Sequence, residues 1–188
     1  MQPMSSLARY GNVLEGWLAI PSAATNTGIA MCAVLYHMEQ IELFEEIDAP
    51  PEVVWNVLLE FDSYPEWNPF VRAIEGVPAT GEQLEVRIEP PDSRGMTFKP
   101  TVIAVDDKRR LAWAGRLIVP FVFDGYHEFH LEPLDDDGAA ERTRLLHRET
   151  FRGALVPLLF DRDRLERGFE AMNTAIKDRA EARVAATA

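Results

Sequence analysis

The strongest pattern along the chain is an apolar stripe near its C-terminus. Apolar residues recur at steps of three, four and seven, at Leu158, Leu165, Phe169, Met172, Ile176 and Ala180. This spacing predicts an amphipathic helix within 154–184. Charged pairs four residues apart on the opposite face, such as Lys177 and Glu181, stabilise a helix by only about 0.2–0.5 kcal/mol each. The stripe must therefore be buried, and its natural partner is a curved sheet built from the rest of the chain.

The chain before this helix is predicted to consist mostly of strands. Residues 40–47 alternate between the two faces of a strand, and Pro50 and Pro51 then mark the start of a short helix. Two further prolines within 62–70 end that helix, because proline interrupts regular helical hydrogen bonding. The remaining strands, separated by turns rich in glycine, proline and aspartate, are expected at 71–75, 83–89, 96–105, 110–118, 126–132 and 142–151. Their short connections favour an antiparallel meander.

The last strand indicates which side chains point inward. One of its faces carries Arg142, Arg144, Arg148 and Arg152, and unpaired guanidinium groups are not buried, so this face is expected to meet solvent. The inward face then carries Thr143, Leu145, His147, Glu149 and Phe151. On the two preceding strands, the residues expected to face inward are Leu111, Trp113, Gly115, His127, Phe129 and Leu131. A hairpin centred on Asp137 would set His127 opposite His147, and a shift of two residues would keep the same faces.

Length and composition narrow the classes of protein. With 188 residues, 47% of them apolar, the chain is long enough for one domain with a sizeable core and an appendage. A net charge of −12 disfavours nucleic acid and anionic membrane surfaces as partners, since phosphates would be repelled. Cys32 is the only cysteine, which excludes an internal disulfide and a thiolate metal site and suits a cytoplasmic location. The sequence does not indicate the oligomeric state of the protein.

Residues 1–38 stand apart from this pattern. No acidic, lysine or arginine side chain occurs between Gly16 and His37, but Pro21, Gly28 and several small polar residues interrupt the apolar run. No stable membrane span is therefore expected. We interpret 1–38 as a poorly ordered extension or as the result of an over-extended start assignment, with membrane association or export as the alternative. The folded domain is expected to cover 39–188.

Several motifs in this domain resemble those of one protein family. They are Ala49-Pro50 with Val54-Trp55, Tyr64-Pro65-x-Trp67-Asn68-Pro69-Phe70, Leu111-x-Trp113-x-Gly115, His127-x-Phe129-x-Leu131, Glu149-x-Phe151-x-Gly153 and Gly168-Phe169-x-x-Met172-Asn173. Over residues 39–183 the chain is similar to the polyketide cyclase/dehydrase and lipid-transport group of the START-like (SRPBCC) superfamily. The resemblance implies an α+β helix-grip fold, in which a seven-stranded antiparallel sheet curls around a long C-terminal helix and two short helices follow the first strand. It also implies a deep apolar cavity between the helix and the sheet.

The resemblance favours binding, or transport, of a hydrophobic small molecule such as a lipid or polyketide. The residues expected to form the site are Trp67, Phe98, Trp113, His127, Phe129, His147, Glu149, Phe169, Met172 and Asn173. The aromatic and methionine side chains in this set also suit a plain packed core. The two histidines and the glutamate differ, because a buried carboxylate needs a partner or a raised pKa. A structural histidine–glutamate hydrogen bond would satisfy that need as well as a functional one.

Three alternatives remain beside binding. Glu149 as base, with His127 or His147 as acid, would suit a cyclase, aromatase or dehydratase acting on a polyketide-like substrate, although the sequence leans towards a protein that is not an enzyme. The same three residues could ligate a metal, but only their composition supports this, and we expect neither a metal nor another cofactor. A protein-interaction or chaperone-activator-like role has no residue pattern of its own.

Overall fold

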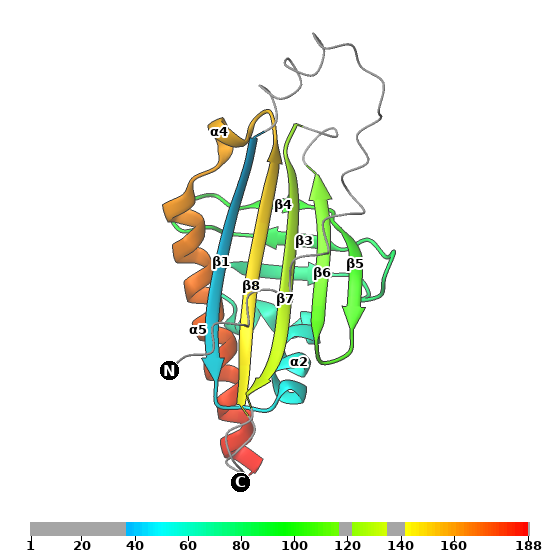
Figure 1. Cartoon of the computed structure of the whole chain (residues 1–188), viewed down its shortest axis with the longest axis vertical. Coiled ribbons are helices and arrows are strands. Elements are labelled where there is room, and N and C mark those ends of the chain that lie inside the picture. The colour runs from blue at the N-terminus through cyan, green and yellow to red at the C-terminus, as the bar shows by residue number, and fades with distance from the viewer. Residues whose placement is uncertain (1–36, 117–121, 135–141, 188) are drawn as a thin grey trace, which may run out of the picture. The chain divides into compact units, whose positions relative to one another are not determined.

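The computed structural model of the chain describes residues 37–116, 122–134 and 142–187. These residues form two antiparallel sheets and a long C-terminal helix (Figure 1). The expectations for the N-terminal extension fall on residues that, apart from His37 and Met38, lie outside the described part. Within that part, we find no helix with the length and apolar character that a membrane crossing requires.

The larger sheet has the strand order β1-β8-β7-β6-β5. Its strands are β1 (His37–Ile47), β5 (Thr101–Asp106), β6 (Arg110–Arg116), β7 (Asp124–Leu134) and β8 (Arg142–Gly153). β5 to β8 follow the expected meander, and β1 is the edge strand next to β8. β1 and β8 pair along their whole length, from His37 opposite Gly153 to Ile47 opposite Thr143. The first and last strands of the chain are thus neighbours, which places the C-terminal helix beside the start of the domain.

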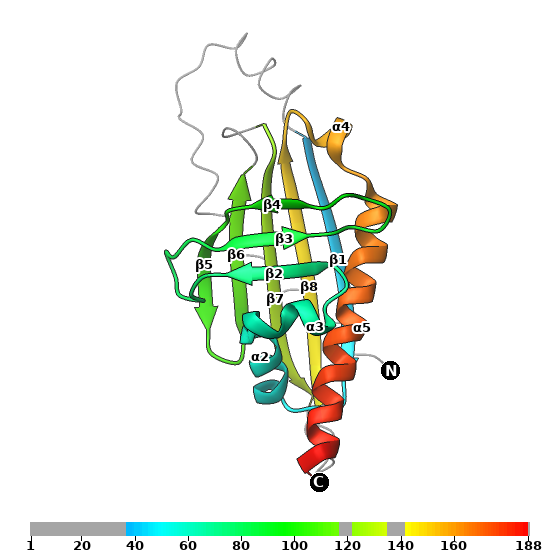
Figure 2. The ribbon, with the colours of Figure 1, turned by 180° about the vertical axis from the view of Figure 1, so that it is seen from behind.

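A second sheet contains the strands β2 (Val71–Glu75), β3 (Glu85–Ile88) and β4 (Met96–Phe98), in that order. Figure 2 shows these strands crossing in front of the larger sheet at a steep angle. The described residues therefore form eight strands in two sheets rather than the expected seven in one. The extra strand arises because the run expected at 96–105 divides at Pro100 into β4 and β5, and proline has no N–H to donate to a strand ladder.

Two helical regions cover the open parts of the sheets. Between β1 and β2 lie α2 (Pro51–Leu59), the 3-10 turn η3 (Phe61–Ser63) and the one-turn helix α3 (Tyr64–Trp67), so the expected pair of short helices after the first strand is confirmed. After β8 lie α4 (Val156–Leu159) and α5 (Arg162–Thr187). The expected C-terminal helix is divided because Phe160 is extended, with φ −83° and ψ 116°. Leu158 lies in α4 and is 77% exposed, so the prediction that it belongs to the buried stripe was wrong.

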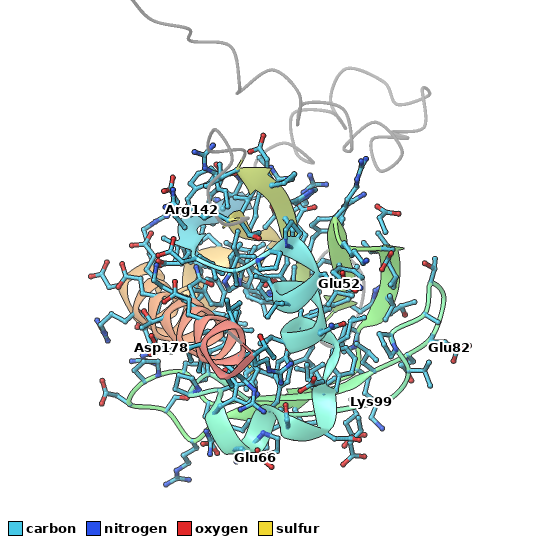
Figure 3. All side chains as sticks on the ribbon, turned by 90° about the horizontal axis from the view of Figure 1, so that it is seen from below. Glu52, Glu66, Glu82, Lys99, Arg142 and Asp178 are labelled. Carbon is cyan, nitrogen blue, oxygen red and sulfur yellow. The ribbon has the colours of Figure 1, made fainter. Side chains whose placement is uncertain are left out.

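The apolar stripe of α5 is buried as predicted. Its members Phe169, Met172, Ile176 and Ala180 are at most 2% exposed, and α5 contacts β1 and α2. Seen from the end of the molecule at which α5 finishes, charged side chains such as Glu66, Lys99 and Asp178 point away from the interior (Figure 3). The α+β helix-grip architecture implied by the family resemblance is therefore confirmed, with the division into two sheets as the difference.

The strand faces follow the predicted parity. Thr143, Leu145 and His147 are fully buried on the inner face of β8. On the outer face, however, Arg142, Arg144 and Arg148 are paired with acids rather than simply solvated. Arg148 pairs with Glu128, which is only 1% exposed, and His130 Nε2 lies 2.8 Å from the same carboxylate. Burial alone would raise the pKa of Glu128, but the hydrogen bond from His130 and the charge of Arg148 lower this pKa to about 2.

A glycine in α5 allows the helix to approach its neighbours closely. A Cβ added to Gly168 would lie 2.4 Å from the ring of Phe70, and Phe70 packs edge-to-face on Phe169 with ring centroids 5.0 Å apart. The absence of a side chain at this position therefore lets Phe70 enter the space between α5 and the smaller sheet.

We expect Gly168→Ala to destabilise the fold, although alanine is the better helix former by about 1 kcal/mol. The methyl group would displace the Phe70 ring, and overpacking of this kind costs about 1–3 kcal/mol. Urea unfolding followed by circular dichroism measures the change in the free energy of unfolding. Ala171→Gly, at an exposed position of the same helix, is the control and reports the propensity effect alone. A more stable Gly168→Ala variant would contradict the prediction.

Candidate functional site

A cavity of about 290 Å³ lies among the inner face of the larger sheet, the smaller sheet and the first turns of α5. Most of its wall is apolar, with six aromatic side chains: Phe70, Phe98, Trp113, Phe123, Phe151 and Phe169. The polar and charged side chains in the wall are Ser93, Arg116, His127, Glu149, Asp161 and Arg164. The cavity therefore combines an aromatic interior with a small set of groups able to donate or accept hydrogen bonds.

Two glycines opposite each other help to make this space. Gly115 of β6 pairs with Gly125 of β7, and both lie in the cavity wall. A Cβ on Gly115 would lie 3.3 Å from the ring of Phe98, and a Cβ on Gly125 would lie 3.0 Å from Oε1 of Glu149. The missing side chains leave room for the carboxyl group and for the void beside it.

Trp113 and His127 form the centre of the inner sheet surface. The two residues are paired across β6 and β7, and their rings stack with centroids 4.5 Å apart and an interplanar angle of 5°. Phe129 packs edge-to-face on both rings. The His127 ring is thereby fixed in orientation, with one flat side covered by the indole.

The register between β7 and β8 decides the partner of His127. His127 lies opposite Glu149, and His147 lies opposite Phe129. The sequence placed His127 opposite His147, so the actual register is shifted by two residues while the inward faces are unchanged. The shift allows Nδ1 of His127 to form a hydrogen bond with Oε2 of Glu149.

Both members of this pair are perturbed by burial. The Glu149 side chain is 12% exposed and the His127 side chain 7% exposed. Burial, followed by the charge of Glu128 on the other sheet face, raises the pKa of Glu149 well above its usual value. Burial lowers the pKa of His127 to about 3, with Glu128 acting weakly in the opposite direction. Burial of both groups therefore favours the uncharged form of the pair, in which the protonated carboxyl donates to Nδ1 of the neutral imidazole.

The second buried histidine has a different environment. Nδ1 of His147 is 2.8 Å from Oδ1 of Asn173 in α5, and its ring packs on Phe169 with centroids 4.5 Å apart. Both residues of this hydrogen bond are at most 2% exposed. Burial lowers the pKa of His147 well below its usual value. His147 is therefore a neutral side chain that attaches α5 to β8 rather than a member of the cavity wall.

The ten residues predicted for the site fall into three groups. The cavity wall includes Phe98, Trp113, His127, Glu149 and Phe169. Phe129, His147, Met172 and Asn173 are buried in the core outside that wall. Trp67 lies in α3, where its Nε1 donates to Ser63 Oγ at 3.1 Å and Arg179 lies over its ring. The structure thus brings half of the predicted set together around one space.

Several wall residues were not predicted. Phe151 and Gly115 were placed on inward faces by strand parity but were not proposed as site residues, whereas Gly125, Phe123, Asp161 and Arg164 had no recognised signal. The acidic and basic residues at the start of α5 line the cavity because the helix begins at its rim. Among the described residues, we find no cluster of histidine, cysteine, aspartate and glutamate that could hold a metal ion.

Comparisons with known proteins agree with this architecture. The sequence model of a family described as "Polyketide cyclase / dehydrase and lipid transport" matches residues 38–185. A search among curated proteins gave no match. Among solved structures, the Zhui aromatase/cyclase from Streptomyces sp. R1128 is 22% identical, with a TM-score of 0.64 over 79% of this chain and 96% of that one. Norcoclaurine synthase from Thalictrum flavum is 17% identical, with a TM-score of 0.56 over 85% and 95% of the two chains. At these identities the likeness shows a shared fold.

The buried pair predicts opposite pH dependences for two variants. His127 contributes stability that is present above its unfolded pKa of 6.5 and is lost as pH falls towards 3. Glu149 contributes stability that is present below its unfolded pKa of 4.5 and is lost as pH rises towards its raised folded value. Between pH 4.5 and pH 6.5, the unfolded pKa values of Glu149 and His127, the wild-type pair holds one proton in both the folded and the unfolded states. The pH dependences that the two residues would cause therefore cancel in the wild type.

Removing one partner should expose the dependence of the other. Relative to wild type, Glu149→Gln is expected to lose stability as pH falls from 6.5 to 4.5, and His127→Gln is expected to lose stability as pH rises over the same range. The limiting slope is about 1.4 kcal/mol per pH unit. Urea unfolding at several pH values measures both. Curves for the two variants that run parallel to wild type would contradict the assignment of a neutral pair.

Proposed function

Since the chain belongs to the polyketide cyclase/dehydrase and lipid-transport family, we propose that it binds a hydrophobic small molecule in the cavity between α5 and the two sheets. One observation carries the proposal: the wall is largely aromatic and apolar, yet it brings His127 and Glu149 together at one point. An apolar space with a few convergent polar groups is the usual form of a small-molecule site.

The composition of the wall indicates which side chains would supply affinity for a ligand and which would supply selectivity. Six aromatic side chains surround the space, and a ligand that hides about 200 Å² of apolar surface against them gains about 5 kcal/mol. The neutral His127–Glu149 pair adds little to this term but favours a ligand that carries an oxygen at the matching place. A ligand without such an oxygen would leave buried polar atoms unpaired, which is costly.

Filling the cavity is expected to weaken binding. N-phenyl-1-naphthylamine, an uncharged aromatic fluorophore, serves as the probe, with its fluorescence titrated against the full chain. Gly115→Leu places a branched side chain against Phe98 inside the cavity and should weaken binding by at least about tenfold, corresponding to 1.4 kcal/mol. Thr97→Leu adds the same side chain at an exposed position of β4 and should leave binding unchanged. Equal affinities of the two variants would count against the cavity as the binding site.

A second candidate function is acid–base catalysis within the same cavity. The observation that favours it is the His127–Glu149 hydrogen bond in the cavity wall. The neutral carboxyl of Glu149 can donate a proton to a substrate oxygen, and the carboxylate that remains can accept a proton from an acidic carbon next to a carbonyl. These are the transfers that an aldol-type cyclisation or a dehydration requires. Two structures of the same fold are described as an aromatase/cyclase and as norcoclaurine synthase, which supports this candidate by analogy of fold.

His127 would assist this chemistry through its own hydrogen bond. It holds the Glu149 carboxyl in place and accepts the carboxyl proton at Nδ1. Nε2 of His127 is buried and finds no hydrogen-bond partner among the described residues. A substrate oxygen that reached this atom would complete its hydrogen bonding, and the imidazole could then pass a proton between Glu149 and that oxygen.

If Glu149 transfers a proton, Glu149→Gln should separate binding from turnover. The amide keeps the shape of the carboxyl but cannot release or regain a proton. We expect the rate of cyclisation of a poly-β-ketone substrate to fall by at least about 100-fold, while the dissociation constant of N-phenyl-1-naphthylamine stays within about twofold. Glu132→Gln, on the outer face of β7 with a side chain 42% exposed, is the matched control. Full activity of Glu149→Gln would exclude Glu149 as the acid–base group.

A further inference from the structure

The charged residues in the cavity wall lie apart from the His127–Glu149 pair. Asp161 directly precedes α5, and Arg164 lies in the first turn of that helix. We propose that Arg164 binds an anionic group of the ligand at the rim of the cavity where α5 begins. The ligand class is then an amphiphile with an aromatic or other apolar body and a carboxylate, sulfate or phosphate group. This inference rests on the binding function proposed above and specifies its ligand.

The guanidinium group of Arg164 has N–H donors available for a hydrogen bond with a ligand. One amine, Nη2, lies 3.3 Å from Oδ2 of Asp161, and the side chain is 41% exposed. Its Nε is buried, and none of the described residues accepts a hydrogen bond from it. Buried donors without an acceptor are rare in folded proteins. The Nε–H and an Nη–H of one guanidinium form a parallel fork that matches the two oxygens of a carboxylate.

Asp161 positions this arginine rather than competing fully for it. Its Oδ1 accepts the backbone N–H of Arg164 at 3.1 Å, which caps the first turn of α5. Its Oδ2 contacts only one of the five N–H donors that a guanidinium carries. The carboxylate therefore holds the Arg164 side chain at the cavity rim and leaves most of the fork unused.

Two related fluorophores test the charge preference. 1-Anilinonaphthalene-8-sulfonate and N-phenyl-1-naphthylamine have the same ring system, and only the first carries an anionic group. With the full chain, we expect Arg164→Gln to raise the dissociation constant of the sulfonate about five- to tenfold, as expected for the loss of a charge-assisted hydrogen bond, and to leave the uncharged probe within twofold.

Arg167→Gln is the control. Arg167 lies three residues further along α5, its side chain is 55% exposed beside Asp92, and it is absent from the cavity wall. Its loss should change neither dissociation constant. If Arg164→Gln weakens both probes equally or neither, the anion site is overturned while cavity binding stands. If neither probe binds the wild-type chain at one site, the proposed function fails together with this inference.

Discussion

The packing of α5 against the inner sheet surface is the interaction on which the rest of the structure depends. The helix begins at the cavity, where Leu165 and Phe169 form part of the wall. Further along, Met172, Ile176 and Ala180 are fully buried. The hydrogen bond between Asn173 and His147 lies between these two regions. The helix and the sheet are therefore held together over the second half of α5, and the space for a ligand is left over its first half.

Two glutamates on neighbouring strands show how the two sheet faces differ. Glu128 points outward, where Arg148 and His130 contact its carboxylate and lower its pKa to about 2 despite burial. Glu149 points inward, where its recorded partner is a histidine that burial keeps neutral, and its pKa rises well above the usual value. One carboxyl group therefore stays charged and stabilises the outer face, while burial of the other favours its protonated form.

The sequence predicted the architecture well because its signals were physical constraints on burial. Four arginines on one face of β8 excluded that face from the interior, and this choice correctly placed His147 and Glu149 inside. It could not fix the register between β7 and β8, because parity is unchanged by a shift of two residues. The partner of His127 therefore came only from the structure. Residues such as Gly125 and Arg164 were missed because their roles depend on the space beside them, and no periodicity in the sequence reports a void.

The opposed glycines of β6 and β7 have a consequence for how this protein could diversify. Gly115 and Gly125 shape the cavity, whereas several of the largest fully buried side chains, such as Phe129 and Leu145, lie outside its wall. The shape of the cavity and much of the packing of the core thus depend on different positions. A single methyl group added at either glycine would alter which molecules fit, while the contacts that hold α5 to the sheet would remain. Such a separation makes ligand preference an evolvable trait, open to change in small steps without a compensating redesign of the fold.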